Sequence, residues 1–143
     1  MLVNNSYKDP ELTRKINDKV GPPFSLIERL KLNGIGSPKL HITGSSIQIH
    51  NLLILDNSIK TCNIELRPKG ILVGFGVRLE TYLLVIPYYK LNLYKGKAEE
   101  YSIYIDHYFI KFRVSKKDKA INAFVKKILN YKTDHQKTNI QDL

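Results

Sequence analysis

The spacing of apolar side chains changes its period near residue 40. Before that point apolar residues recur every three or four positions, as Leu12, Ile16 and Val20 do, which is the period of an α-helix. After it, apolar and polar residues alternate, which is the period of a half-buried β-strand. The helical period returns near the end of the chain. The sequence therefore predicts short helices, then a run of strands, then a longer helix.

Two short helices are predicted in the first part of the chain. Residues 9–20 form the first, because Asp9 can cap its start, a proline follows at the first helical position, and Gly-Pro-Pro ends it. Ser25 and Glu28 have the spacing of a capping box, which predicts the start of a second short helix.

Seven strands are predicted after these helices, and an additional strand is possible at residues 39–43. Two of the seven are apolar on both faces, so we expect them to be buried on both sides. Glycines in the first of these two indicate a bend or bulge, and Pro87 indicates a break after the second. The seven predicted strands are 46–55, 61–67, 70–77, 81–87, 89–95, 101–105 and 107–114.

The sequence of the last two predicted strands indicates how they pair with each other. Their large apolar side chains alternate, but the parity changes between the strands. A two-residue turn at Asp106 and His107 removes the mismatch by pairing position 105 with 108, 103 with 110 and 101 with 112. We expect a type I′ turn, since Asp and His tolerate the left-handed backbone that this turn requires.

The final helix is the clearest element. Ser115 and Asp118 have the spacing of a capping box, and the residues after them place apolar side chains on one helical face. This face must cover an apolar surface, and the sheet offers the only large one. The polar residues 133–143 are expected to fray. The apolar face consists of Ile121, Phe124, Val125, Ile128 and Leu129.

Length and composition narrow the class of protein. The chain has 143 residues, the size of one ordinary domain, and 43% of them are hydrophobic. Cys62 is the single cysteine, which excludes an internal disulfide, and strand alternation points it inward as a structural residue. The N-terminus lacks a signal-peptide pattern, and no apolar run approaches the roughly 20 residues of a membrane-spanning helix. We therefore expect a cytoplasmic protein.

The net charge is +10, which favours anionic partners such as nucleic acid, anionic lipid or an acidic protein. Most of the surplus is lysine, and Lys, Ile and Asn are all abundant, as in a chain encoded by an AT-rich genome. Composition alone is therefore a second explanation of the charge, and the sequence leaves both explanations open.

No catalytic or metal-binding pattern is visible. His41, His50, His107 and His135 are isolated and lack the spacing of a zinc site. The glycine-containing segments lack the lysine and hydroxyl of a phosphate-binding loop. Asp106 precedes His107 directly, but adjacent residues point to opposite faces. We expect a protein that is not an enzyme and that uses no cofactor or metal.

One predicted surface combines aromatic rings with cations. In the predicted register, Tyr104 lies opposite Phe109 and Ser102 opposite Lys111 on the outer face, and Tyr88 and Tyr94 can join them. Platforms for single-stranded nucleic acid combine rings that stack on bases with cations that meet phosphates. The same residues suit an extended peptide or anionic headgroups. Alternatively, the rings are only good strand formers, and the N-terminal segment covers this face. The candidate binding residues are Lys90, Tyr104, Phe109, Lys111 and Arg113.

The element order over residues 40–131 resembles the pleckstrin-homology-like (PH-like) superfold, with seven antiparallel strands before one amphipathic helix. The phrase Leu84-Val-Ile-Pro-Tyr-Tyr-Lys-Leu91 is similar to a strand of bacterial PH-like proteins of unknown function. The resemblance implies an α+β, mostly antiparallel fold. Its seven strands would form a partly open barrel of two orthogonal sheets, capped by the C-terminal helix, with the short N-terminal helices as an addition.

The resemblance also implies a binding or scaffolding module rather than an enzyme. Members that bind phosphoinositides carry a basic cluster around their first strand–loop–strand. Here the corresponding loop offers only Lys60, so phosphoinositide binding does not carry over.

The sequence thus predicts a domain at 39–132, an N-terminal helical extension at 1–38 packed on it, and a polar tail at 133–143. The leading interpretation is a non-enzymatic binding module whose partner is a peptide, a protein subunit or an anionic surface. One alternative is a nucleic-acid-binding protein that uses the basic aromatic face. Another is a small-ligand carrier or enzyme that uses the barrel interior.

Overall fold

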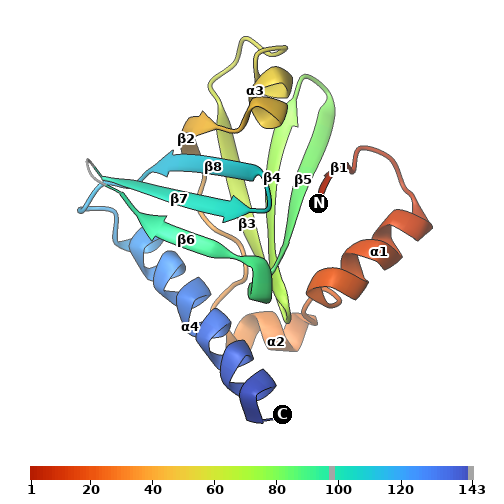
Figure 1. Ribbon diagram of the computed structural model, residues 1–143, viewed down its shortest axis with the longest axis vertical. Helices are drawn as coiled ribbons and strands as arrows, with labels where there is room; N and C mark the ends of the chain where they lie inside the picture. The colour runs from red at the N-terminus through yellow and green to blue at the C-terminus, as the bar shows by residue number, and fades with distance from the viewer. Residues whose placement is uncertain (97–98, 142–143) are drawn as a thin grey trace.

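The computed structural model describes residues 1–96 and 99–141 and shows an α+β fold built on one antiparallel sheet of eight strands (Figure 1). The strands are β1 (Leu2–Asn4), β2 (Leu40–Ser45), β3 (Thr61–Arg67), β4 (Gly70–Val77), β5 (Glu80–Pro87), β6 (Asn92–Lys95), β7 (Glu100–Ile105) and β8 (Tyr108–Arg113). The helices are α1 (Pro10–Val20), α2 (Leu26–Lys31), α3 (Ile47–Leu53), the short 3-10 helix η1 (Tyr88–Lys90) and α4 (Lys119–Gln141).

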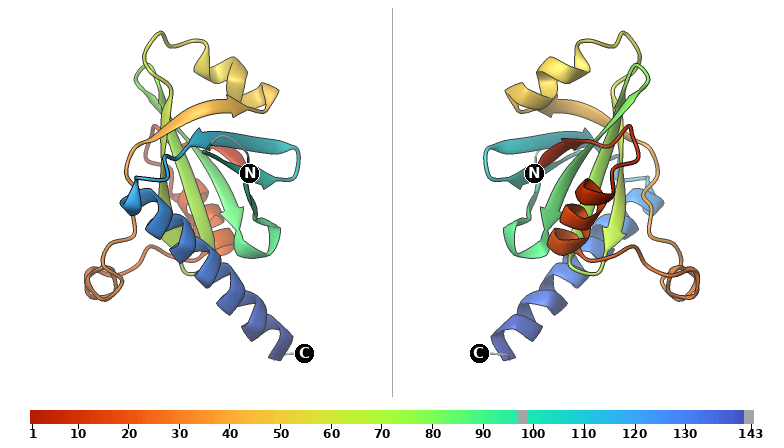
Figure 2. Two further views of the ribbon diagram at one scale, coloured as in Figure 1. Left: turned by 90° about the vertical axis from the view of Figure 1, so that its left-hand side faces the viewer. Right: turned by 90° about the vertical axis from the view of Figure 1, so that its right-hand side faces the viewer.

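The sheet is bent around one main core but does not close into a barrel. Its strand order is β1-β5-β4-β3-β2-β8-β7-β6, so β1 and β6 are its two edges. Strands β6, β7 and β8 run at a steep angle to β3, β4 and β5 (Figures 1 and 2). The concave face carries the main core, which includes Ile64, Ile71, Leu84, Ile103 and Phe112.

Helix α4 covers the open side of this core, as its apolar face predicts. Ile121, Phe124, Val125 and Ile128 are all buried in the core, whereas Leu129 lies at the edge of the helical face and is 41% exposed. The helix continues to Gln141 in the part that the structure describes, so the segment expected to fray is largely helical.

The start of α4 differs from the predicted capping box. The Asp118 carboxylate accepts a hydrogen bond from the Ile121 N–H at 3.0 Å, so Asp118 caps the helix. Ser115 lies in the preceding turn, where its hydroxyl accepts from the Lys117 N–H at 3.2 Å. The capping-box pattern therefore predicted the start of the helix correctly, but it placed the capping residue three positions too early.

Strand β4 except Gly76, and residues 84–87 of β5, are buried on both faces because α1 packs on their convex side, which confirms the prediction for these positions. Leu72 and Val85 form a second apolar cluster there with Ile16 and Val20 of α1. The right-hand view of Figure 2 shows α1 lying against the outside of these strands. The core of the molecule therefore has two parts, one on each side of β4 and β5.

The bulge expected in the strand 70–77 is absent. Strand β4 pairs with both of its neighbours without a change of register. The irregularity lies instead in β2, where the pairing with β8 shifts between Ile42 and Gly44. The glycines of β4 serve a different purpose, since they leave room on the convex face of the sheet.

The prediction of a strand at 46–55 is wrong, because Ile47–Leu53 forms helix α3. Ile49 and Leu53 lie one helical turn apart and are both buried, whereas Ile47 is 63% exposed. The additional strand considered at 39–43 is confirmed as β2. The sheet also has a strand that was not expected, since β1 pairs with β5 at the N-terminal edge.

The segment after Pro87 also differs from the prediction. The break at Pro87 is confirmed, but η1 follows it directly, and the strand predicted at 89–95 is reduced to β6. The side chain of Tyr88 turns into the core and is fully buried.

The predicted register of the last hairpin is confirmed. Tyr104 pairs with Phe109, Ser102 with Lys111, and the apolar positions share the inner face. The turn is not type I′, however. Asp106 has a positive φ of 52°, but His107 does not share it, and a type I′ turn needs both.

Candidate binding surfaces

The outer face of β6, β7 and β8 presents a continuous row of aromatic rings. The ring centroids of Tyr94 and Tyr104 lie 5.7 Å apart in an edge-to-face arrangement, and those of Tyr104 and Phe109 lie 5.5 Å apart. The ammonium group of Lys111 lies 5.6 Å from the centroid of Phe109. Arg113 follows Lys111 two positions along the same strand. We call these residues the ring–cation face: Tyr94, Tyr104, Phe109, Lys111 and Arg113.

The N-terminal segment does not cover this face. Strand β1 pairs with β5, and α1 packs on β4 and β5, at the other end of the sheet. Helix α4 packs on the concave side. Tyr94 is 57% exposed, Arg113 is exposed, and the remaining members of the face are half-buried by one another. The rings therefore meet solvent directly.

The Glu100 carboxylate lies at one end of the ring–cation face. Glu100 pairs across the hairpin with Arg113 and accepts a hydrogen bond from the Thr43 hydroxyl at 2.5 Å. The neighbours of the rings on β6 and β7 are Asn92 and Ser102, which are uncharged. The face consequently keeps a positive charge beside its aromatic centre.

Two residues that the sequence associated with this face lie elsewhere. The Lys90 ammonium lies 3.7 Å from the Asp106 carboxylate at the turn end of the hairpin and 6.0 Å from the ring centroid of Tyr89, which is not part of the ring–cation face. Tyr88 points inward, where its hydroxyl donates to the carbonyl of Arg67 at 3.1 Å. Burial raises the pKa of the Tyr88 hydroxyl far above its usual range. The structure thus groups four of the five candidate residues and separates Lys90.

Cys62 is packed in the core as its strand alternation predicts. Burial raises the pKa of its thiol to about 12, so the reactive thiolate is scarce at neutral pH.

Within the described residues, no group of three or more metal-ligating side chains lies together. Among the described helices, none combines the length and apolar character needed to cross a bilayer.

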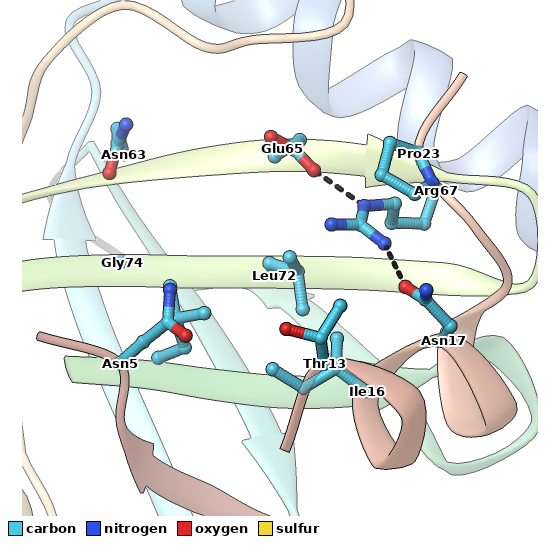
Figure 3. A pocket seen from close by; sticks show the side chains of 11 residues that line it. Asn5, Thr13, Ile16, Asn17, Pro23, Asn63, Glu65, Arg67, Leu72 and Gly74 are labelled. Carbon is cyan, nitrogen blue, oxygen red and sulfur yellow. Dashed lines mark hydrogen bonds and ion pairs between the residues drawn. The ribbon is translucent and has the colours of Figure 1, made fainter. Parts of the chain in front are cut away.

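A second candidate site lies on the convex face, between α1 and strands β3 and β4 (Figure 3). It is a groove of about 230 Å³ whose floor is Leu72, Gly74 and Leu83. One wall comes from β3 and the other from α1. We call it the Arg67 groove. The side chains at its walls and rim are Asn5, Thr13, Ile16, Asn17, Pro23, Asn63, Glu65 and Arg67.

Arg67 is the most constrained charged residue of this groove, with a side chain only 10% exposed. Its Nε donates to the Glu65 carboxylate at 2.5 Å. Its Nη1 donates to the Asn17 side chain and to the carbonyl of Gly21, both at 3.0 Å. These bonds tie the end of α1 to β3.

Sequence reasoning missed the Arg67 groove. A signal was present in β3, where Asn63, Glu65 and Arg67 alternate with the inward-facing Cys62 and Ile64. A polar stripe on a strand usually faces solvent, so nothing in the strand itself indicated that α1 would form a wall over it.

The chain matches no protein-family model, and no curated protein or solved structure is significantly similar to it.

Proposed function

We propose that this protein is a non-enzymatic binding module and that the ring–cation face binds single-stranded nucleic acid. The observation that carries the proposal is the row of Tyr94, Tyr104 and Phe109 on the outer face, with Lys111 and Arg113 beside it. Membership of the PH-like superfold and a cytoplasmic location belong to the same proposal.

Physical chemistry favours this ligand over the other anionic partners. Flat rings on a sheet offer stacking surfaces for unpaired bases, and each stacked base contributes about 1–3 kcal/mol. Cations at the margin of the rings reach the phosphates that connect those bases. Lys111 already lies against the Phe109 ring, so a phosphate that draws it away frees the face of that ring for a base. The net charge of +10 supports attraction of a polyanion from a distance.

The test is fluorescence polarisation of labelled single-stranded DNA and RNA over a series of salt concentrations. We expect micromolar or tighter binding that weakens as salt rises. The double variant Lys111→Glu/Arg113→Glu should lose most of this binding. If two phosphate contacts are lost, the slope of log affinity against log salt should fall by roughly 0.7 for each contact.

The matched control is Arg14→Glu/Lys15→Glu, which makes the same change of charge on exposed positions of α1. This control should bind nearly as well as the original protein if the ring–cation face is the site. Equal losses in both double variants would mean that only overall charge matters, and the proposal would be wrong. Absence of binding to either nucleic acid would also reject it and would direct attention to protein or peptide partners.

A further inference from the structure

The Arg67 groove is independent of the ring–cation face and lies under α1, on another part of the convex surface (Figure 3). An arginine side chain has five N–H donors. Nε uses one and Nη1 uses two, all on partners within the protein. Within residues 1–96 and 99–141, Nη2 has no hydrogen-bond partner. In Figure 3 this nitrogen points between Glu65 and Leu72, into the groove.

Nη2 is the part of the guanidinium that meets the open groove, because no fully buried side-chain nitrogen or oxygen in the described part of the chain lacks a hydrogen-bond partner. A charged nitrogen on a side chain that is only 10% exposed can donate there to an oxygen anion. One of the two remaining N–H groups of Arg67 can donate to a carboxylate oxygen, and hydrogen bonds between charged groups are stronger than those between neutral groups. The three bonds already made hold the guanidinium in place, so little further ordering is needed when a ligand binds.

Glu65 restricts the type of anion. Its carboxylate contacts Arg67 through Oε2, while Oε1 has no partner within residues 1–96 and 99–141. The groove therefore has one positive and one negative group side by side and no net charge. A phosphate would be repelled by Glu65, whereas an ammonium group beside the bound carboxylate would be attracted to it. The arrangement is complementary to a ligand with adjacent opposite charges.

The rest of the groove fits an aliphatic substituent. Leu72 and Leu83 form an apolar floor, and Ile16 adds an apolar side chain from α1. Gly74 keeps the floor open, since a Cβ at that position would lie 2.9 Å from the Asn63 side chain and 3.3 Å from Leu83. The groove has a volume of about 230 Å³, which suits a small metabolite rather than a polymer.

We propose that the Arg67 groove binds a free aliphatic α-amino acid. Its carboxylate accepts from Arg67 Nη2, its ammonium group donates to Glu65, and its side chain packs on Leu72 and Leu83. A peptide end carries only one of these two charges, so the free amino acid is the better match.

The experiment compares leucine, its desamino acid and its decarboxylated amine. Binding is measured by calorimetry and by amide chemical shifts of Gly74 and Asn63 in the full chain. Leucine should bind saturably in the millimolar range or tighter, and each analogue should bind about tenfold more weakly, a difference of about 1.4 kcal/mol. If no standard α-amino acid shows saturable binding, or if the analogues bind as well as leucine, the proposal fails.

The decisive variants leave Arg67 in place, because it also holds the end of α1. Glu65→Gln keeps an acceptor for Arg67 but removes the charge that meets the ammonium group. It should reverse the preference, so that the desamino acid binds at least as well as leucine. Thr13→Phe places a large ring at the rim and should abolish binding, whereas Arg14→Phe, one position along α1, should not. Unchanged preference in Glu65→Gln, or unchanged affinity in Thr13→Phe, would overturn the assignment.

Discussion

Gly70 is a residue at which the sheet and α1 approach each other closely. A Cβ at this position would lie 2.2 Å from the carbonyl oxygen of Ile86 and 2.7 Å from a methyl group of Val20. Both distances are well inside van der Waals contact, and the first involves backbone that cannot rotate away. The absence of a side chain therefore allows α1 to seal the second apolar cluster over β4 and β5.

Gly70→Ala should therefore destabilise the fold. We expect the free energy of unfolding to fall by about 1–3 kcal/mol, the usual cost of overpacking a core. Urea denaturation followed by circular dichroism measures this loss. Gly76→Ala is the matched control, because its Cβ would meet the nearest atom, the carbonyl oxygen of Glu80, at 3.8 Å. Equal stability of the two variants would show that α1 can shift at no cost.

Most of the elements could be predicted because the pattern of their apolar residues matches one kind of element better than the other. The strands 61–67 and 70–77 match β3 and β4, since each has a continuous alternation or a continuous apolar run. Helix α3 was missed because Ile47 and Ile49 are two residues apart, as in a strand, while Ile49 and Leu53 are also one helical turn apart. A short apolar run satisfies both periods, and only its packing decides between them.

The two candidate sites differed in how far sequence could predict them. Four of the five residues of the ring–cation face lie on one hairpin, whose register follows from the parity of its apolar residues. The Arg67 groove joins Asn17, Glu65 and Leu83, which belong to three elements far apart in sequence. No local spacing encodes such a meeting, because it depends on where α1 lands on the sheet. Lys90 was misplaced for a related reason, since η1 interrupts the predicted strand.

Asp56 links two elements at one end of the sheet. Its carboxylate accepts from the N–H and hydroxyl of Ser58 in the loop after α3, and from the Arg78 N–H in the β4–β5 turn at 2.6 Å. The Ser58 hydroxyl, the Ser58 N–H and the Arg78 N–H lower the pKa of Asp56 from 3.8 to about 2. The link between loop and turn therefore depends on the ionised carboxylate.

The contribution of Asp56 should depend on pH in a defined window. Because its pKa is lower in the folded chain, folding is favoured by the ionised form at pH values above about 4, the usual unfolded value. This contribution should decline as the pH falls from about 4 towards 2, and it should be absent in Asp56→Asn. A titration of the Asp56 carboxyl carbon by NMR tests the prediction directly. A midpoint near the usual value would show that the link does not hold in solution.

At the scale of the whole molecule, the concave face of the sheet holds the main core, and both proposed sites lie on the convex face. The main core fills the concave side and joins strands from both halves of the bent sheet to α4. On the convex side, α1 packs on β4 and β5 and is tied to β3 through Arg67, so the outer face of β6 to β8 stays open and a groove remains beside β3. The two proposed sites can therefore vary without loss of the main core.

This division predicts that damage to α4 affects the whole molecule rather than one end. Ile128→Ala removes a fully buried side chain that contacts the main core and should cost about 2–5 kcal/mol in the free energy of unfolding. Leu129→Ala, on the adjacent residue that is 41% exposed, should cost much less. In the Ile128 variant, tyrosine fluorescence and backbone circular dichroism should change together in urea, because α4 and both halves of the sheet share one core. Separate transitions would show instead that α4 and the strands β6 to β8 unfold independently of β3 to β5, and the sheet would then have two cores that merely touch.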